Sequence, residues 1–241
     1  MNCQQPTATA DFRLIITSDG SHTLYVPSLN EHYHSVRGAV QESRHVYIGS
    51  GFRYICKNML HDSLKILEVG FGTGLNALLT LLEAEHAGVE VYYEALEKYP
   101  LPMEVVAELN YATASGLPDK RLFMRLHSTA WDQQVCLSPY FTLHKRLADL
   151  LAYEPEMLFD LIYFDAFAPD VQPDLWTEAV FRKLYECLCP GGTLVTYSSK
   201  GAVKIALRQA GFNLWRLSGA GGKRHMLRAV KSGITVPAGN S

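Results

Sequence analysis

The sequence predicts an α/β fold in which a mostly parallel, seven-stranded sheet carries helices on both faces. Two observations support this prediction. From residue 65 onward, short apolar runs alternate with segments of helical spacing, a pattern typical of parallel strands joined by crossover helices. A glycine-rich turn follows the first of these runs, at the point where an open α/β sheet places its ligand site. The 241 residues, 48% of them hydrophobic, suffice for one domain with a sizeable core.

The expected elements follow one another in a regular order. Strands are expected at residues 65–69, 90–95, 121–126, 160–164, 193–197, 212–217 and 225–229. Helices are expected at residues 76–87, 101–110, 176–188 and 202–210. The last two strands are joined by a short glycine-rich loop, which favours an antiparallel closing pair.

Residues 1–60 are expected to form an extension to a Rossmann-like domain at 61–241. Two β-type runs, residues 12–17 and 23–26, flank a Ser-Asp-Gly-Ser turn and predict a hairpin. Residues 45–48 either add a strand or begin a helix over residues 50–60.

Composition excludes several classes of protein. No apolar run reaches the length of a membrane span, and the N-terminus lacks the pattern of a signal peptide. We therefore expect a cytoplasmic protein with no membrane contact. The five cysteines are scattered, the spacing of Cys187 and Cys189 does not suit zinc, and no HExxH motif is present. We expect no bound metal.

The turn at residues 70–74 has the form GxGxG and lies between a strand and a helix. Leu75 stands where the dinucleotide-binding fingerprint requires its third glycine. The pattern thus favours a nucleoside with an amino-acid moiety over a pyrophosphate. The turn and its flanks are expected to contact this cofactor through Glu68, Gly70, Gly72, Gly74 and Asn76.

Two acidic residues complete the expected cofactor site. Glu97 follows the second strand of the sheet, where its carboxylate can accept both hydroxyls of a ribose. Asp149 lies between the expected third and fourth strands, where it can accept the adenine amino group. With the glycine turn they form a three-point set that suits S-adenosylmethionine, and the neighbouring Lys98 is expected to contact the same cofactor.

The acceptor side of the crevice is expected at the end of the strand over residues 160–164. Asp165 can accept hydrogen bonds from an amine nucleophile and is the candidate catalytic residue. Phe167 and Pro169 are expected to shape the pocket wall. Trp176 either stacks on a base or packs in the core.

Positive charge is concentrated near the C-terminus. Residues 200–231 hold eight Lys and Arg and no Asp or Glu, although the formal net charge of the chain is −2. Such segregation is typical of a nucleic-acid surface or of a solvated face. Lys200, Lys223 and Arg224 are the candidate RNA contacts.

Two motifs are more specific than the glycine turn: a DxFAP…PxxW run from Asp165 to Trp176, and GKRxML at residues 222–227. With these motifs the sequence resembles the methyltransferase domain of MnmC, and especially its stand-alone bacterial relatives of the MnmD type. The resemblance covers most of residues 25–230.

The resemblance implies a class I S-adenosylmethionine-dependent methyltransferase that acts on the anticodon loop of tRNA. The family methylates the aminomethyl group on C5 of the wobble uridine, giving 5-methylaminomethyl-(2-thio)uridine. Asp165 aligns with the residue that positions the amine, and Glu97 with the ribose-binding acid. Two-domain members add a flavin oxidoreductase half, which this 241-residue sequence does not contain. We therefore expect no flavin and no obligate protein partner.

Two other functions fit parts of the sequence. A small-amine methyltransferase or an aminopropyltransferase-like enzyme would share the fold, but would favour a more acidic acceptor pocket than the basic C-terminal stretch suggests. A non-catalytic RNA-binding scaffold would be expected to lose Asp165 or Glu97, and both are present.

Overall fold

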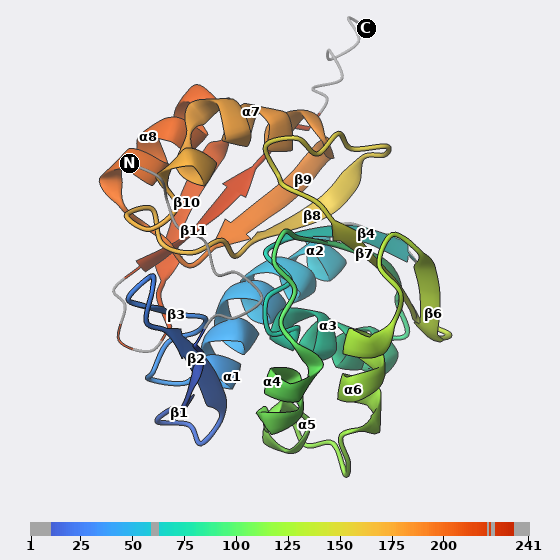
Figure 1. Ribbon diagram of the computed structural model, residues 1–241. Helices are drawn as coiled ribbons and strands as arrows, with labels where there is room; N and C mark the ends of the chain where they lie inside the picture. The colour runs from blue at the N-terminus through green and yellow to red at the C-terminus, as the bar shows by residue number, and fades with distance from the viewer. Residues whose placement is uncertain (1–10, 59–62, 221, 223–224, 234–241) are drawn as a thin grey trace, which may run out of the picture.

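The computed structural model describes residues 11–58, 63–220, 222 and 225–233. Within them, an eight-stranded sheet has the order β10-β11-β9-β8-β4-β5-β7-β6, and a separate three-stranded sheet has the order β1-β2-β3 (Figure 1). The strands are β1 (Arg13–Ile16), β2 (His22–Val26), β3 (Glu31–His32), β4 (Ser63–Val69), β5 (Glu90–Glu97), β6 (Gln134–Ser138), β7 (Phe141–Leu147), β8 (Phe159–Phe164), β9 (Leu188–Thr196), β10 (Asn213–Ser218) and β11 (His225–Val230).

Helical segments connect most of these strands. They are α1 (Ala39–Ser43), the π-helical η1 (Arg44–Phe52), α2 (Arg53–Asn58), α3 (Leu75–Ala87), α4 (Met103–Glu108), α5 (Tyr111–Ala114), α6 (Arg121–Ser128), the 3₁₀ turn η2 (Pro173–Trp176), α7 (Glu178–Glu186) and α8 (Gly201–Gln209).

The pairing of the strands confirms the predicted class of fold. β4 runs parallel to β5 and β8, while β7 and β9 continue the parallel sheet on either side. β10 and β11 form the expected antiparallel closing pair. The additional strand β6 pairs antiparallel with β7 and makes the sheet eight-stranded rather than seven-stranded.

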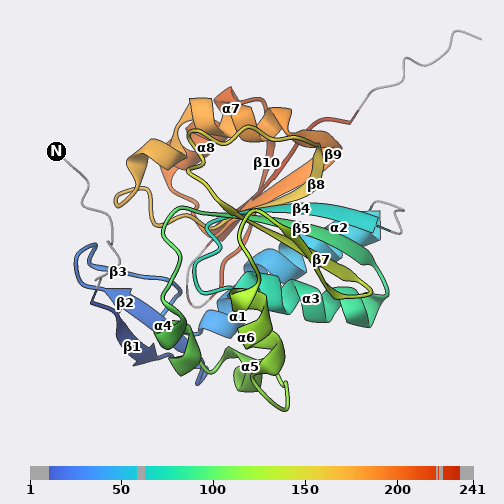
Figure 2. The same cartoon turned by 45° about the vertical axis from the view of Figure 1, so that its right-hand side comes forward.

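Two hydrophobic cores lie on opposite faces of the large sheet. Successive residues of a strand point to opposite faces, so Ile66 of β4 enters the core beneath η1 and α3, whereas Leu67 enters the core beneath α7 and α8. Both side chains are fully buried. The result is a three-layer arrangement, with α3 on one side of the sheet and α7 and α8 on the other (Figure 2).

The predicted strand at residues 121–126 is wrong, because this segment forms helix α6. Phe123 and Leu126 are its buried residues and lie three positions apart, on one helical face. A short apolar run fits a strand or a helix equally well by periodicity alone. The strand that actually pairs with β5 is β7, twenty residues further along the chain.

β7 escapes recognition because it carries His144, Lys145 and Arg146 in succession. His144 and Lys145 are nonetheless only 7% and 1% exposed. His144 Nδ1 lies 2.7 Å from the hydroxyl of Tyr92, and Lys145 donates to the carbonyl of His127. Buried polar groups with such partners are tolerated inside a sheet, but the partners cannot be identified from local sequence.

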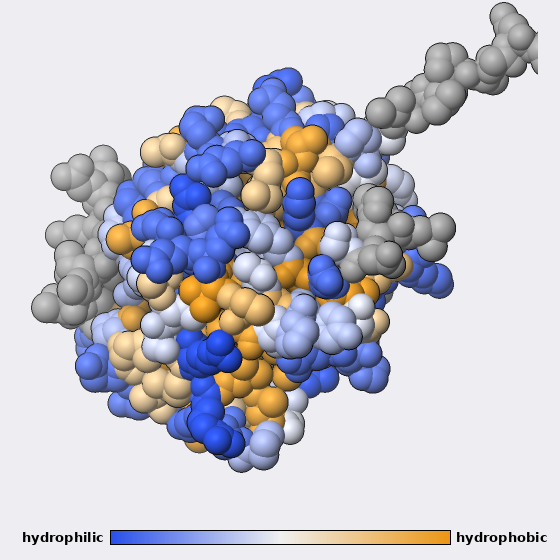
Figure 3. Space-filling model, turned by 90° about the vertical axis from the view of Figure 1, so that its right-hand side faces the viewer, coloured by the Kyte–Doolittle hydropathy of each residue, from blue (hydrophilic) through white to orange (hydrophobic). Residues whose placement is uncertain are grey.

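The N-terminal residues form the predicted hairpin, with β1 antiparallel to β2, and β3 adds a third strand. Residues 45–48 are helical and belong to η1. Val46 and Phe52 of this segment pack in the same hydrophobic core as Ile66. Hydrophobic and hydrophilic residues are interspersed on the surface (Figure 3). None of the described helices has the length and apolar character needed to cross a membrane.

Candidate active site

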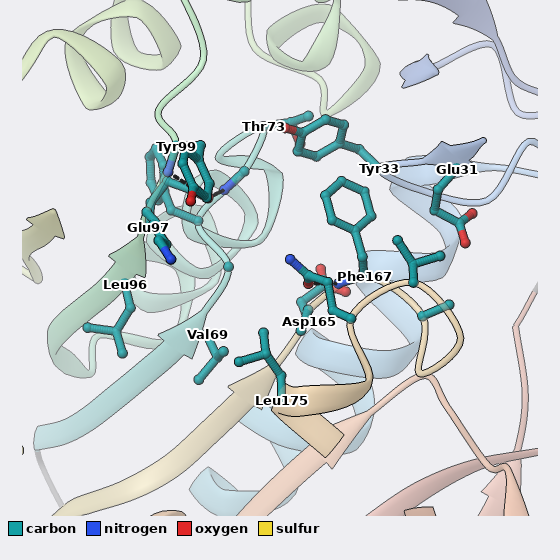
Figure 4. Close-up of a pocket in the computed structure, with 18 of the residues that line it drawn as sticks. Glu31, Tyr33, Val69, Thr73, Leu96, Glu97, Tyr99, Asp165, Phe167 and Leu175 are labelled. Carbon is teal, nitrogen blue, oxygen red and sulfur yellow. Dashed lines mark hydrogen bonds between the residues drawn. The ribbon is translucent and has the colours of Figure 1, made fainter. Parts of the chain in front are cut away.

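A cavity of about 850 Å³ opens at the carboxyl ends of β4, β5 and β8. Its volume falls in the usual range for small-molecule sites, roughly 300–1,000 Å³. Most of the predicted site residues line it: Gly70, Gly72, Asn76, Glu97, Lys98, Asp149, Asp165 and Phe167. The cavity therefore gathers residues that are separated by nearly one hundred positions in the sequence (Figure 4).

The glycine turn is tight and closely packed. Gly70, Gly72 and Gly74 have φ values of 88°, 47° and 69°, a region that side-chain-bearing residues seldom adopt. A Cβ on Gly70 would lie 2.8 Å from the carbonyl oxygen of Asp165, and one on Gly72 would lie 3.1 Å from the Tyr33 ring. The glycines thus let two walls of the cavity approach each other.

Glu97 anchors this turn at the end of β5. Its Oε2 accepts the amide of Gly72 at 2.9 Å, and its Oε1 accepts the amide of Tyr99 at 2.8 Å. Burial raises the pKa of Glu97, and these backbone amides oppose that shift. Each carboxylate oxygen keeps further lone-pair capacity toward the cavity.

Lys98 and Asp149 form an ion pair across the mouth of the cavity. Lys98 Nζ lies 2.7 Å from Asp149 Oδ2, while Asp149 Oδ1 accepts the amide of Leu151. Burial alone would raise the pKa of Asp149, but the hydrogen bonds from Lys98 and Leu151 hold it below its usual value. Asp149 lies two residues beyond the end of β7, and Glu97 is the last residue of the neighbouring β5.

Asp165 follows β8 and is held on two sides. Its Oδ1 accepts the Tyr47 hydroxyl at 2.6 Å, and its Oδ2 accepts the side-chain amide of Asn76 at 2.8 Å. Burial, and then the adjacent Asp165 carboxylate, raise the pKa of Tyr47, so its hydroxyl remains a proton donor. The orientation of the carboxylate is therefore fixed before any ligand arrives.

Aromatic rings form the wall beside Asp165. The rings of Tyr33 and Phe167 meet edge to face, with centroids 5.0 Å apart (Figure 4). Phe167 is held by its backbone: its amide donates to Gln172 Oε1 at 3.0 Å, and its carbonyl accepts the Trp176 indole at 2.8 Å. Tyr197 donates to the carbonyl of Ala166 at 3.0 Å in the same loop.

Five further predicted site residues lie outside the cavity lining. Glu68 is buried behind it and accepts the side-chain amide of Asn76 at 3.0 Å, and Gly74 precedes α3. Trp176 is 6% exposed and lies beneath the Phe167 loop. Pro169 does not line the cavity, and Lys200 forms an ion pair with Asp170. Lys223 and Arg224 lie outside the described residues.

Sequence reasoning did not assign a role to Tyr33 or Tyr47. Both come from the N-terminal part of the chain, more than one hundred residues before Asp165. Their local sequence carries no sign of that contact. The signal that could have found them is the resemblance itself, since it covers most of residues 25–230 and so includes both tyrosines.

Metal ligation is a separate question from cofactor binding. Across the residues that the structure describes, no group of three or more His, Cys, Asp or Glu side chains is placed to hold a metal ion.

Comparisons with known proteins extend these observations. Residues 138–232 match the model of a family described as S-adenosyl-L-methionine-dependent methyltransferase. The tRNA 5-methylaminomethyl-2-thiouridine biosynthesis bifunctional protein MnmC of Burkholderia multivorans is 35% identical over 237 residues, which cover 91% of this chain and 34% of that protein. MnmC of Pseudomonas entomophila is 30% identical, covering 85% of this chain and 33% of that protein.

A solved structure agrees with the sequence relatives. MNMC2 from Aquifex aeolicus superimposes with a TM-score of 0.71 at 27% identity, covering 91% of this chain and 70% of that one. The chain is thus similar to S-adenosylmethionine-dependent methyltransferases over residues 138–232 and to MnmC proteins over most of its own length. It spans about a third of the length of its curated MnmC relatives. Spermidine synthase from Thermotoga maritima, with a TM-score of 0.53 at 15% identity over 95% of this chain and 81% of that one, shares the fold alone.

The residues of the cavity fit S-adenosylmethionine. Among the described residues, the buried Oδ1 of Asn76 has no hydrogen-bond partner, so it is available to a ligand donor. Apolar side chains at strand ends, Val69 and Leu96, stand beside the carboxylates of Glu97 and Asp165 (Figure 4). An apolar wall with acidic groups suits an adenine ring joined to a cationic amino-acid moiety.

Proposed function

We propose that the protein is an S-adenosylmethionine-dependent methyltransferase that methylates the aminomethyl nitrogen on C5 of the wobble uridine in the anticodon loop of tRNA, giving 5-methylaminomethyl-(2-thio)uridine. The observation that carries the proposal is the Asp165 carboxylate, oriented by Tyr47 and Asn76 and flanked by Phe167. The names of the MnmC relatives, which specify biosynthesis of this nucleoside, support the choice of acceptor.

The glycine-turn side of the cavity is assigned to the cofactor. Glu97 has acceptor capacity for the ribose hydroxyls, and Asp149 stands where it can receive the adenine amino group. Asn76 Oδ1 is available for a donor of the amino-acid moiety. The bound cofactor supplies an electrophilic methyl group on a positively charged sulfur.

The acceptor amine must be neutral to attack, with its lone pair aimed at the methyl carbon. Asp165 can accept one amine N–H, which turns the lone pair away from the carboxylate and fixes its direction. Because Tyr47 and Asn76 already hold both carboxylate oxygens, little reorganisation is needed during transfer. The methylated nitrogen is cationic until it releases a proton, and Asp165 stabilises that charge.

The proposed reaction starts from an amine that is already formed on the tRNA. It therefore involves no oxidation step, and we propose that it requires neither flavin nor metal. The acceptor must come from enzymes that install the aminomethyl group on the uridine.

Methyl transfer from labelled S-adenosylmethionine tests the proposal. The acceptor is bulk tRNA from a bacterium that lacks the final methylation, and the products are digested to nucleosides. Label in 5-methylaminomethyl-2-thiouridine is the expected result. Label in spermidine or another small amine, with none in tRNA, would contradict the proposed acceptor and favour a small-amine enzyme.

A further inference from the structure

A second, smaller hollow lies at the β10 edge of the sheet, between α8 and the β10–β11 pair. It has a volume of about 160 Å³ and is lined by Lys204, Arg208, Leu214, Arg216 and Leu227. Three of its five lining residues are cationic and none is acidic. None of the roles assigned above involves this hollow.

The secondary structure explains how the three cations meet. Lys204 and Arg208 are four residues apart on α8 and therefore share one helical face. Leu214 and Arg216 alternate along β10 and point to the same side of the sheet. Arg216 pairs with Leu227 of β11, whose buried side chain contributes to the floor.

The charges of these three cations are not neutralised within the part of the protein that the structure describes. Among the described residues, none of the three side chains forms an ion pair or a hydrogen bond, whereas Lys98, Lys183 and Lys200 all do. Like charges at i and i+4 on a helix oppose each other. Arg216 adds a third positive charge to the same hollow and increases this repulsion. An anion bound in the hollow would relieve the repulsion, so the arrangement favours an anionic ligand.

Basic residues also connect the loop beside the active-site cavity with the hollow along the sequence. Lys200, immediately before α8, forms an ion pair with Asp170 in the loop that carries Phe167. Lys200, Lys204 and Arg208 follow one another at intervals of four, so they form a stripe ~12 Å long on one side of the helix. This stripe leads from the rim of the cavity toward the hollow.

We propose that the hollow formed by Lys204, Arg208 and Arg216 binds a backbone phosphate of the tRNA while the modified base occupies the cavity. This inference rests on the proposed function. Arginine guanidinium groups bind phosphate oxygens in a bidentate manner, and the apolar floor limits competition from water. The site contributes affinity without reading the base sequence.

Salt-dependent tRNA binding by the full chain tests this site. The test variant is Arg208→Gln with Arg216→Gln. The control, Lys57→Gln with Lys65→Gln, removes the same charge from α2 and from the amino-terminal part of β4, whose carboxyl end faces the cavity. Each lost phosphate contact should lower the slope of log affinity against log salt by ~0.7–0.9. Because the hollow holds one phosphate, we expect a loss of ~0.7–0.9 for the test variant and almost no change for the control.

Lys204→Gln provides a milder variant, with about half that loss of slope expected. Equal slopes for the test variant and the control would overturn the phosphate site and leave the proposed function standing. No tRNA binding by the unaltered protein would overturn both. Normal binding and the expected slope loss, without methylation of tRNA, would support the site and contradict the proposed reaction.

Discussion

The two walls of the active-site cavity are built in different ways. The wall assigned to the cofactor is built at the ends of neighbouring strands. Its key contacts involve the backbone, as where the amide of Gly72 donates to the carboxylate of Glu97 at the end of β5. The acceptor wall combines Tyr33 and Tyr47 from the N-terminal part with Asp165 and Phe167. The first wall depends on backbone geometry, and the second on contacts across more than one hundred residues.

Under the proposed function, this difference locates the specificity for the acceptor on the second wall. Backbone amides and glycines make a site that suits any class I methyltransferase, because they recognise features common to the cofactor. The acceptor wall depends on side chains from an N-terminal segment that packs against the same core. The substitutions below test whether the two walls can be impaired separately.

The largest effect is expected on the acceptor wall, at Asp165. In Asp165→Ala the amine loses its orienting acceptor, so kcat should fall by ~10²–10³-fold while tRNA affinity is retained. Labelled methyl transfer and filter binding measure the two quantities. Asp170→Ala, in the same loop, is the control and should keep kcat. Unchanged turnover in Asp165→Ala would refute the role.

A smaller effect is expected from the residue behind Asp165. Tyr47→Phe removes one hydrogen bond to a carboxylate, worth ~1.5 kcal/mol, so kcat should fall about tenfold with little change in KM. Tyr163→Phe is the matched control, because the Tyr163 ring lies 5.2 Å from the Tyr47 ring. An equal loss of kcat in both variants would indicate a packing effect and not positioning of Asp165.

The cofactor wall is tested by two glycines with similar backbone. Gly72 and Gly88 have φ values of 47° and 66°, so alanine at either should cost ~1–2 kcal/mol of stability. Only at Gly72 would the new methyl group meet the Tyr33 ring, at 3.1 Å; Gly88 has open space. Calorimetry should show cofactor binding weakened severalfold in Gly72→Ala alone. Equal weakening in both variants would contradict the close approach of the walls.

The last effect concerns stability at low pH. Burial lowers the pKa of His127, beside the glycine turn, from 6.5 to about 4. The unfolded chain therefore binds a proton that the folded chain does not, and the free energy of unfolding should decrease as pH falls from about 6.5 toward about 4. Denaturant unfolding of His127→Gln should show a shallower decrease. The same slope as the unaltered protein would argue against a neutral buried His127.

Sequence alone predicted the parallel sheet, the glycine turn and the strand-end acids, because each depends on residues close together in the chain. It placed a strand at residues 121–126 and missed β7, since burial of Lys145 depends on partners that folding supplies. It named Asp165 but not Tyr47, which holds it. The sequence could not decide whether Trp176 stacks on a base or packs in the core. The hydrogen bond from its indole to the Phe167 carbonyl, which only the fold reveals, places it beneath the loop.

A crystal structure of the protein with S-adenosylhomocysteine, the demethylated form of the cofactor, tests the central claim most directly. The account predicts that the nucleoside lies against residues 70–74, with the ribose hydroxyls at Glu97, and that the space between Asp165 and Phe167 stays open for the acceptor. A nucleoside packed against Tyr33 and Phe167, away from Glu97, would contradict the assignment of the two walls.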